Sequence, residues 1–125
     1  MLGVGIDIVD IKRMRRVLSS NGGSFLNRVF TKREIANSKK FKNKAEYFSK
    51  LFAFKESFVK AKGCGFTSLA RPSNIEVQLY NRLKSKSFFP KKMKAYFKNK
   101  KVNLIDVEYF KVEDNIVCKL IVDLK

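Results

Sequence analysis

The first ten residues place the strongest constraint on what this chain can fold into. Residues 2–9 are apolar except for two glycines and one carboxylate, a pattern that predicts a buried β-strand. Alternate positions share a face, so one face carries Leu2, Val4, Ile6 and Ile8 and the other carries Gly3, Gly5, Asp7 and Val9. Glycines inside a strand cost stability and often mark the close approach of another backbone or a ligand. We therefore expect Asp7 to be functional, because Asp10 already fills the alternative role of capping the following helix.

A second constraint is a helix expected over about Glu46–Lys62, followed by Gly63-Cys64-Gly65. Glu56 and Lys60 lie four positions apart and therefore on one side of that helix. Most such pairs are surface ion pairs of little energetic weight. Here the flanking Phe and Ala residues and the Gly-x-Gly loop, whose N–H groups can face a phosphate, favour a functional pair. With Asp7, these groups could hold a divalent cation and a diphosphate, which indicates phosphoryl-group chemistry.

Composition narrows the chemistry further. The 125 residues are enough for one domain, residues 1–125, with a sizeable core. Histidine is absent, which excludes Ser-His catalysis and His-ligated zinc, so any metal must be held by carboxylates, which favours Mg²⁺. The two cysteines, Cys64 and Cys118, are too few for a disulfide framework and are expected to be small, semi-buried residues.

No apolar stretch is long enough to span a membrane and the N-terminus lacks the pattern of a signal peptide, so we expect a cytoplasmic protein with no membrane partner. The net charge of +17 would attract polyanions: nucleic acid, anionic lipid, an acidic protein or phosphorylated small molecules. The basic residues run from Lys12 to Lys125 without a basic tail, so a generally solvated Lys-rich surface explains much of the charge equally well.

The remaining pattern predicts an α+β fold with a mostly antiparallel sheet packed with helices. The expected elements are a helix from Ile11 to Asn21-Gly22-Gly23, a helix start at the capping box Thr31–Glu34, a basic connection over 39–44, a strand over 74–80, a short helix over 89–98, and strands over 102–110 and 116–124 joined by a somewhat long turn at 113–115.

Three blocks, Gly3–Arg13, Val29–Ile35 and Phe52–Gly65, resemble the holo-acyl-carrier-protein synthases, the small bacterial 4′-phosphopantetheinyl transferases. The resemblance spans nearly the whole chain and implies the 4′-phosphopantetheinyl transferase fold. It implies transfer of the phosphopantetheine arm of coenzyme A to a serine of acyl carrier protein, with release of adenosine 3′,5′-bisphosphate, in fatty acid biosynthesis. It also implies a homotrimer with active sites at the subunit clefts.

The resemblance assigns roles to individual residues. Asp7 and Glu56 would be the Mg²⁺ ligands, and Glu56 and Lys60 the catalytic residues, with Lys60 beside the diphosphate. Lys60, Gly63, Cys64 and Gly65 would lie against coenzyme A. The base that takes the serine proton stays open between Glu56 and a metal-bound water. Docking of the acidic carrier would fall to the basic residues on or near the first helix, Arg13, Arg15, Arg16 and Arg28.

The chain departs from the family pattern at several positions. Asp106-Val107-Glu108 stands where His-Val-Ser is usual, and Ser85-Lys86-Ser87 where Gly-Lys-Pro is usual. Cys64 replaces a Thr, and Leu51 replaces an Arg beside Lys50. These changes predict altered contacts with coenzyme A rather than loss of the metal site.

Two other interpretations remain. A small basic RNA- or ribosome-binding protein would suit the charge, but the aromatic residues are mostly Phe at core-like spacing, without an Arg-aromatic strand, so we expect no nucleic-acid partner. A catalytically dead relative acting as a binding module is disfavoured because Asp7, Glu56 and Lys60 are all present.

Overall fold

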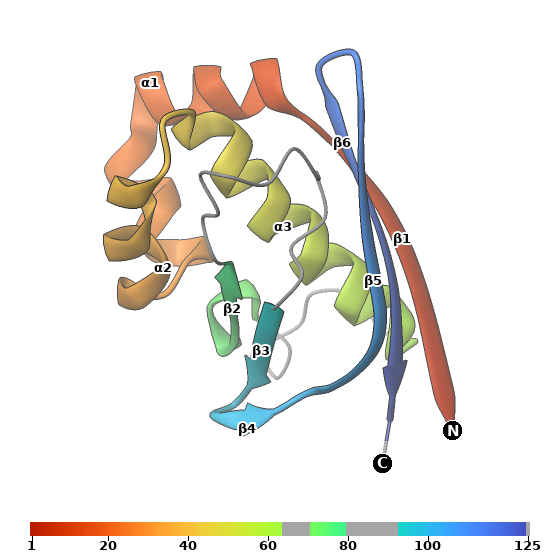
Figure 1. Ribbon diagram of the computed structural model, residues 1–125. Helices are drawn as coiled ribbons and strands as arrows, with labels where there is room; N and C mark the ends of the chain where they lie inside the picture. Colours follow the sequence, from red (N-terminus) through yellow and green to blue (C-terminus); the bar gives the residue numbers. More distant parts are fainter. Residues whose placement is uncertain (64–70, 80–92, 125) are drawn as a thin grey trace.

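The computed structural model describes residues 1–63, 71–79 and 93–124 (Figure 1). In chain order the elements are β1 (Leu2–Asp10), α1 (Ile11–Val29), α2 (Lys32–Asn37), the short 3₁₀ helix η1 (Ser38–Lys40), α3 (Lys44–Ala61), the 3₁₀ helix η2 (Pro72–Asn74), β2 (Ile75–Leu79), β3 (Met93–Phe97), β4 (Lys100–Lys101), β5 (Asn103–Val112) and β6 (Asn115–Asp123).

The strands form two antiparallel sheets of three strands each, in the orders β1-β6-β5 and β2-β3-β4. Figure 1 shows α3 lying along the first sheet, α1 running from the top of β1 across the N-terminal end of α3, α2 on the side of α3 away from that sheet, and the second sheet next to α3. The α+β prediction with antiparallel strands is confirmed. None of the helices in the described ranges is long and apolar enough to cross a membrane.

The glycine face of β1 packs directly on the backbone of α3. A Cβ atom added at Gly5 would overlap the carbonyl oxygen of Ser57, and one added at Gly3 would lie 2.5 Å from that of Ala61. Two residues of a strand span about 6.6 Å and four residues of a helix about 6 Å, so both glycines can meet successive turns of α3. The glycines therefore serve the approach of a helix backbone, and they bring Asp7 alongside α3.

The opposite face of β1 is exposed, so the predicted buried strand is buried on one face only. Leu2, Val4, Ile6 and Ile8 are between 51% and 62% exposed. Gly3, Gly5 and Asp7 face the core instead, because β1 can approach the backbone of α3 this closely only where its inward positions are glycines.

The short helix predicted over 89–98 is wrong in the described part of that range, where Met93–Phe97 forms β3. Its residues pair with β2, from Ile75 opposite Phe97 to Leu79 opposite Met93. Ala95 is fully buried between half-buried or exposed neighbours, and pairing with β2 satisfies the backbone of both strands. Tertiary pairing thus outweighs the helical spacing of the apolar residues.

Two predicted turns also differ. Helix α1 continues to Val29, and Asn21 (φ −150°, ψ 40°) marks a kink where an end was expected. The β5–β6 turn is the two-residue Glu113-Asp114, shorter than predicted, with Glu113 at φ 56°. A helix can continue beyond the kink because Leu26 and Val29 bring apolar surface back to the core.

The predicted helix starts are confirmed. Asp10 accepts hydrogen bonds from the N–H groups of Lys12 and Arg13, and Thr31 and Glu34 form a reciprocal capping box. Helix α3 starts two residues earlier than predicted, at Lys44, where the Asn43 side chain caps it. Cys118 is buried and free, as expected, whereas Cys64 lies outside the described residues.

We predict that Gly5→Ala lowers the free energy of unfolding by about 1–3 kcal/mol or more, since the added methyl group meets a backbone carbonyl that cannot move away. Gly22→Ala is the matched control: the space around Gly22 is open, and alanine favours a helix over glycine by about 1 kcal/mol. Urea denaturation of both variants measures the difference, and equal stability of the two would contradict the close β1–α3 contact.

Candidate active site

Asp7, Glu56 and Lys60 meet where β1 crosses α3. The Lys60 Nζ atom donates a hydrogen bond to Asp7 Oδ1 at 2.6 Å and another to the Ile6 carbonyl oxygen at 3.3 Å. The Asp7 side chain is 10% exposed, whereas that of Lys60 is 55% exposed. The hydrogen bond to Asp7 is the main reason that the pKa of Lys60 is raised. A buried carboxylate is thus paired with a cation whose outer side faces solvent.

Glu56 is the titratable group of this site whose pKa departs furthest from its ordinary value. Burial, followed by hydrogen bonding and charge repulsion with Asp7, raises the pKa of Glu56 to about 8, while Lys60 opposes the shift. Two carboxyl groups this close cannot both ionise without a neutralising partner. In the absence of another cation, Glu56 therefore holds a proton near neutral pH.

The two carboxylates fit the Mg²⁺ that the family resemblance implies. Asp7 Oδ2 is buried and has no fixed hydrogen-bond donor in the described part of the chain, so a protonated Glu56 or a cation is what can satisfy it. Within the same residues there is no group of three or more His, Cys, Asp and Glu side chains that could hold a metal. A site with two carboxylates suits Mg²⁺, which keeps several waters and takes substrate phosphates as further ligands.

A groove of about 560 Å³ leads from Glu56 along α1. Its apolar wall includes Met14 and Val17 of α1, Phe25 and Phe52. Arg13 also lines the groove, so it connects a basic position on the surface to the carboxylate pair. The sequence prediction missed this groove because helical spacing suggests core packing for Met14 and Val17, and the turn expected at residue 21 separated Phe25 from them.

The other predicted site residues are placed as follows. Gly63 lies just beyond α3 with φ 77°, and its N–H donates to the Lys60 carbonyl oxygen at 2.9 Å. Cys64 and Gly65 lie outside the described residues. Arg13, Arg16 and Arg28 are exposed along α1, and of these Arg13 lines the groove.

Two of the departures from the family pattern take on a structural meaning. Leu51 is fully buried, so the side chain at this position belongs to the core and cannot contact a ligand. Asp106 follows an irregularity in the β5–β6 pairing between Leu104 and Asp106, on the strand separated from β1 by β6. Ser85-Lys86-Ser87 lies outside the described residues.

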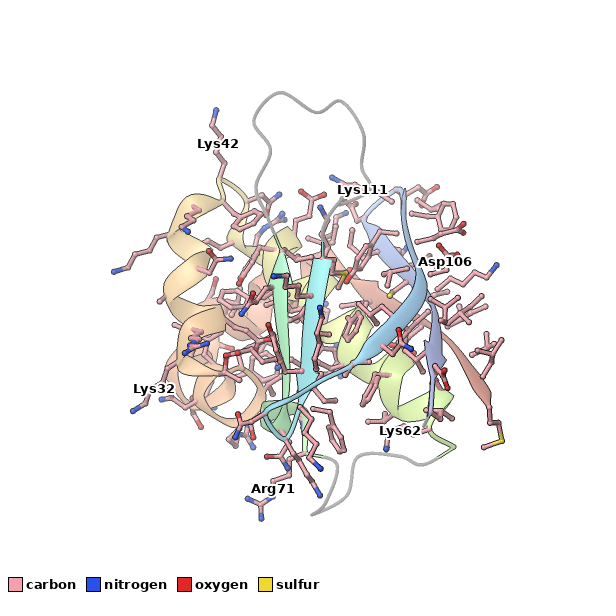
Figure 2. The ribbon with its side chains drawn as sticks, turned by 60° about the horizontal axis from the view of Figure 1, so that its bottom comes forward. Lys32, Lys42, Lys62, Arg71, Asp106 and Lys111 are labelled. Atoms are coloured by element: carbon pink, nitrogen blue, oxygen red, sulfur yellow. The ribbon has the colours of Figure 1, made fainter. Side chains whose placement is uncertain are left out.

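The basic residues labelled in Figure 2 lie at separate edges of that view: Lys42 and Lys111 at the top, Lys32 at the left, Arg71 at the bottom and Lys62 at the lower right. These residues therefore do not gather in one patch, in line with the spread of basic residues along the chain.

Comparison with known proteins identifies the class. The profile of the 4′-phosphopantetheinyl transferase superfamily matches residues 3–118, which include Asp7, Glu56 and Lys60. The chain therefore belongs to this superfamily of transferases.

Curated relatives identify the family to which the chain belongs within this superfamily. A holo-[acyl-carrier-protein] synthase of Wolbachia pipientis subsp. Culex pipiens is 45% identical over 87 residues, which is 67% of this chain and 68% of that protein. The holo-[acyl-carrier-protein] synthase of Ruthia magnifica is 37% identical over 100 residues, 80% of this chain and 79% of that protein. The chain is accordingly a member of the holo-[acyl-carrier-protein] synthase family, an enzyme family, which confirms the resemblance.

Solved structures confirm the fold. A holo-[acyl-carrier-protein] synthase from Neisseria meningitidis superimposes with a TM-score of 0.76 at 23% identity, covering 97% of both chains. The Helicobacter pylori holo-[acyl-carrier-protein] synthase, solved in complex with coenzyme A, gives a TM-score of 0.74 at 19% identity, covering 96% of this chain and 99% of that one.

We predict that Asp7→Asn lowers the pKa of Glu56 from about 8 toward, but not to, its ordinary value of 4.5, because the repulsion disappears and the burial remains. Carboxyl ¹³C NMR titration of the metal-free protein measures this shift, with Asp114→Asn as a control in the β5–β6 turn. An unchanged Glu56 pKa in Asp7→Asn would contradict the coupling.

The same shift fixes the sign of the pH dependence. The folded-state pKa of Glu56 lies above the ordinary value, so its contribution favours the folded state fully below about pH 4.5 and is lost as the pH rises through about 8. The free energy of unfolding of the Glu56→Gln variant should lack this pH-dependent contribution.

Proposed function

We propose that this protein transfers the 4′-phosphopantetheine group from coenzyme A to a serine of an acidic acyl carrier protein, with release of adenosine 3′,5′-bisphosphate and in dependence on Mg²⁺. The observation that carries the proposal is the meeting of Asp7, Glu56 and Lys60 at one end of a groove whose wall includes Arg13. Membership of the family and the coenzyme A bound to the Helicobacter pylori relative support the same reading. We place the reaction in the cytoplasm and in fatty acid biosynthesis.

Asp7 and Glu56 would hold the Mg²⁺, which when bound neutralises charge on the diphosphate of coenzyme A. Lys60 adds a second positive charge on a flexible stem. Because its side chain is 55% exposed, its ammonium group can turn from Asp7 to the diphosphate and follow the charge that develops on the leaving group. Gly63, which lies just beyond α3, would extend the coenzyme A site, and the family resemblance assigns Cys64 and Gly65 to the same site.

The carrier supplies the nucleophile, so the enzyme needs to position the serine and accept its proton. Glu56 lines the groove that starts at Arg13, whereas Asp7 is not part of the groove wall. We assign acceptance of the proton to Glu56 on this ground, because a base must come within hydrogen-bond reach of the serine hydroxyl. Arg13, Arg16 and Arg28 would draw the acidic carrier toward α1, mainly by raising the association rate.

A homotrimer would use the exposed apolar face of the β1-β6-β5 sheet. The exposed apolar side chains there are Leu2, Val4, Ile6 and Ile8 of β1 and Ile105, Phe110 and Val112 of β5. Apolar faces of this extent mark interaction sites more often than free surface. Sedimentation equilibrium that gives only a monomer would contradict this assembly.

The RNA- or ribosome-binding alternative draws on the net charge alone. The basic residues labelled in Figure 2 lie at separate edges of the view and do not form the stripe that tracks a nucleic-acid backbone. The transferase proposal accounts for the same charge through an acidic partner and an anionic substrate.

We predict that incubation with apo acyl carrier protein, coenzyme A and Mg²⁺ adds the mass of phosphopantetheine to the carrier, as measured by intact-protein mass spectrometry. Asp7→Asn and Glu56→Gln should each lower the rate by about 100-fold or more, because loss of metal-borne charge stabilisation costs several kcal/mol. Circular dichroism serves as the control for folding. No mass shift with any of several carriers would reject the proposed reaction.

We further predict that rising ionic strength increases the KM for the carrier several-fold more than the KM for coenzyme A, since exposed charges are screened. Arg13→Gln combined with Arg16→Gln should remove part of this salt dependence. The matched control replaces Lys32 and Lys42, which do not line the groove, with Gln. The same salt dependence in both double variants would argue against docking on α1.

A further inference from the structure

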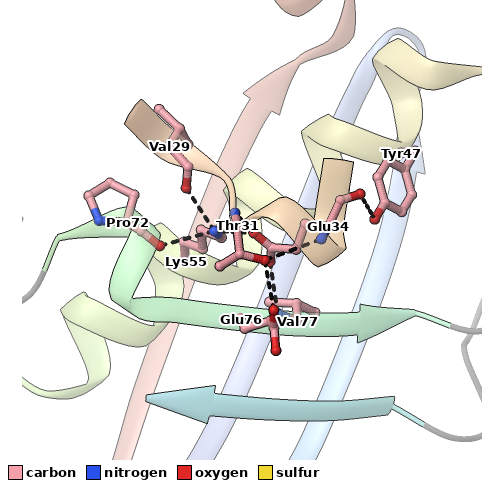
Figure 3. Close-up of polar contacts among 8 residues, drawn as sticks. All are labelled: Val29, Thr31, Glu34, Tyr47, Lys55, Pro72, Glu76 and Val77. Atoms are coloured by element: carbon pink, nitrogen blue, oxygen red, sulfur yellow. Dashed lines mark hydrogen bonds and ion pairs between the residues drawn. The ribbon is translucent and has the colours of Figure 1, made fainter. Parts of the chain in front are cut away.

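A buried ion pair lies directly behind the proposed active site. Lys55 and Glu34 have side chains that are 0% exposed, with 2.6 Å between Lys55 Nζ and Glu34 Oε1 (Figure 3). Lys55 Nζ also donates to the carbonyl oxygens of Val29 at 2.8 Å and Pro72 at 3.0 Å. Each of its three N–H donors therefore has an acceptor from a different segment of the chain.

The carboxylate is equally well bound. Glu34 Oε1 accepts the N–H of Thr31 and Oε2 accepts the N–H of Val77, both at 2.8 Å. The Tyr47 hydroxyl donates to the Glu34 carbonyl oxygen at 2.7 Å. Through this one pair, α3 is joined to the end of α1, to α2, to η2 and to β2.

A gain in folding stability is not a sufficient reason for a buried ion pair of this kind. Burying two charges costs several kcal/mol per ion, and apolar residues of similar size often replace a buried pair without loss. The pair instead restrains the orientation of α3, because a lysine with three fixed acceptors allows its helix little rotation about the helix axis.

Glu56 lies between two fixed neighbours on α3. Successive side chains of a helix point about 100° apart, so the direction of Glu56 falls midway between those of Lys55 and Ser57. Lys55 is held by the buried ion pair. Ser57 is fully buried, donates its hydroxyl to the Cys118 carbonyl oxygen at 3.2 Å, and lies with its backbone against Gly5.

We propose that Lys55 is a positioning residue for the reaction. Through Glu34 and the carbonyl groups of Val29 and Pro72, it fixes the rotation of α3 so that Glu56 points at Asp7 and the two carboxylates can hold Mg²⁺ together. This role rests on the proposed function.

The test uses Lys55→Met combined with Glu34→Gln, a neutral pair of similar volume that leaves no unpaired buried charge. Glutamine at position 34 still suits the capping box. Val77→Ala is the matched control, since it removes core contacts beside the pair and keeps the backbone N–H that binds Glu34. All proteins are compared at a temperature at which their circular dichroism is native.

The readout is Mg²⁺ binding in the presence of coenzyme A, measured by calorimetry, together with kcat and the KM for the carrier. We expect the double variant to bind Mg²⁺ about tenfold more weakly, as is usual when a residue that orients a ligand is lost, and kcat to fall while the carrier KM stays within about twofold. Val77→Ala should match the wild type in Mg²⁺ binding. Equal Mg²⁺ binding by the folded double variant and the wild type would overturn the proposal.

If the double variant does not fold, Lys55→Arg replaces it, because this change keeps a positive charge paired with Glu34 and alters the geometry with which the side chain meets its three acceptors. A weaker Mg²⁺ affinity in this variant supports the positioning role, and an unchanged affinity overturns it. A wild-type protein that neither binds Mg²⁺ with coenzyme A nor modifies a carrier would overturn the proposed function itself.

Discussion

The contact between the glycines of β1 and the backbone of α3 is the interaction on which the rest of the structure depends. Gly3 and Gly5 allow β1 to touch the carbonyl groups of Ala61 and Ser57. Any side chain at these positions would hold the strand and helix apart by at least the width of a methyl group. The next inward residue of β1 is Asp7, so the approach that glycine permits is also what brings a carboxylate within 2.6 Å of Lys60. The close contact between β1 and α3 therefore determines both the packing of these elements and the position of the Asp7 carboxylate.

Two different kinds of contact, on opposite sides of α3, fix the position of this helix. On the β1 side the contact is steric, between side-chain-free backbone and carbonyl groups. On the far side it is polar, through the completely buried Lys55 and its acceptors. Steric contact fixes the distance between two elements but permits sliding and rotation, whereas hydrogen bonds to three separate segments fix direction. On the proposed function, α3 carries a catalytic carboxylate, Glu56, and such a helix needs both kinds of restraint.

Local signals in the sequence predicted the parts of the fold that depend on local physics. The cap at Asp10, the capping box at Thr31 and Glu34, and the alternation along β6 follow from nearby residues alone. The strand Met93–Phe97 could not be predicted in this way, because its pairing partner Ile75–Leu79 lies many residues earlier in the chain. The sequence also placed Glu34 in a capping box but not in an ion pair, since Lys55 comes 21 residues later. The meeting of Asp7 with Glu56 and Lys60 was expected from the hypothesis of a shared cation and from the family resemblance, whereas the glycine pattern by itself indicated only that a backbone or a ligand approaches the strand closely.

Charge balance at the proposed site links its metal to its protons. In a structure without a metal, one ammonium group and one proton neutralise two carboxyl groups, because Lys60 pairs with Asp7 and the pKa of Glu56 is about 8. On the proposed function, a divalent cation between the carboxylates would replace the proton, since ligands must be deprotonated. Lys60 would then be released from its role as the counter-ion of Asp7 and become available to the diphosphate. The same substitution of charges would prepare both the metal site and the lysine, so Asp7 and Glu56 act as a unit and neither can be replaced without disturbing Lys60.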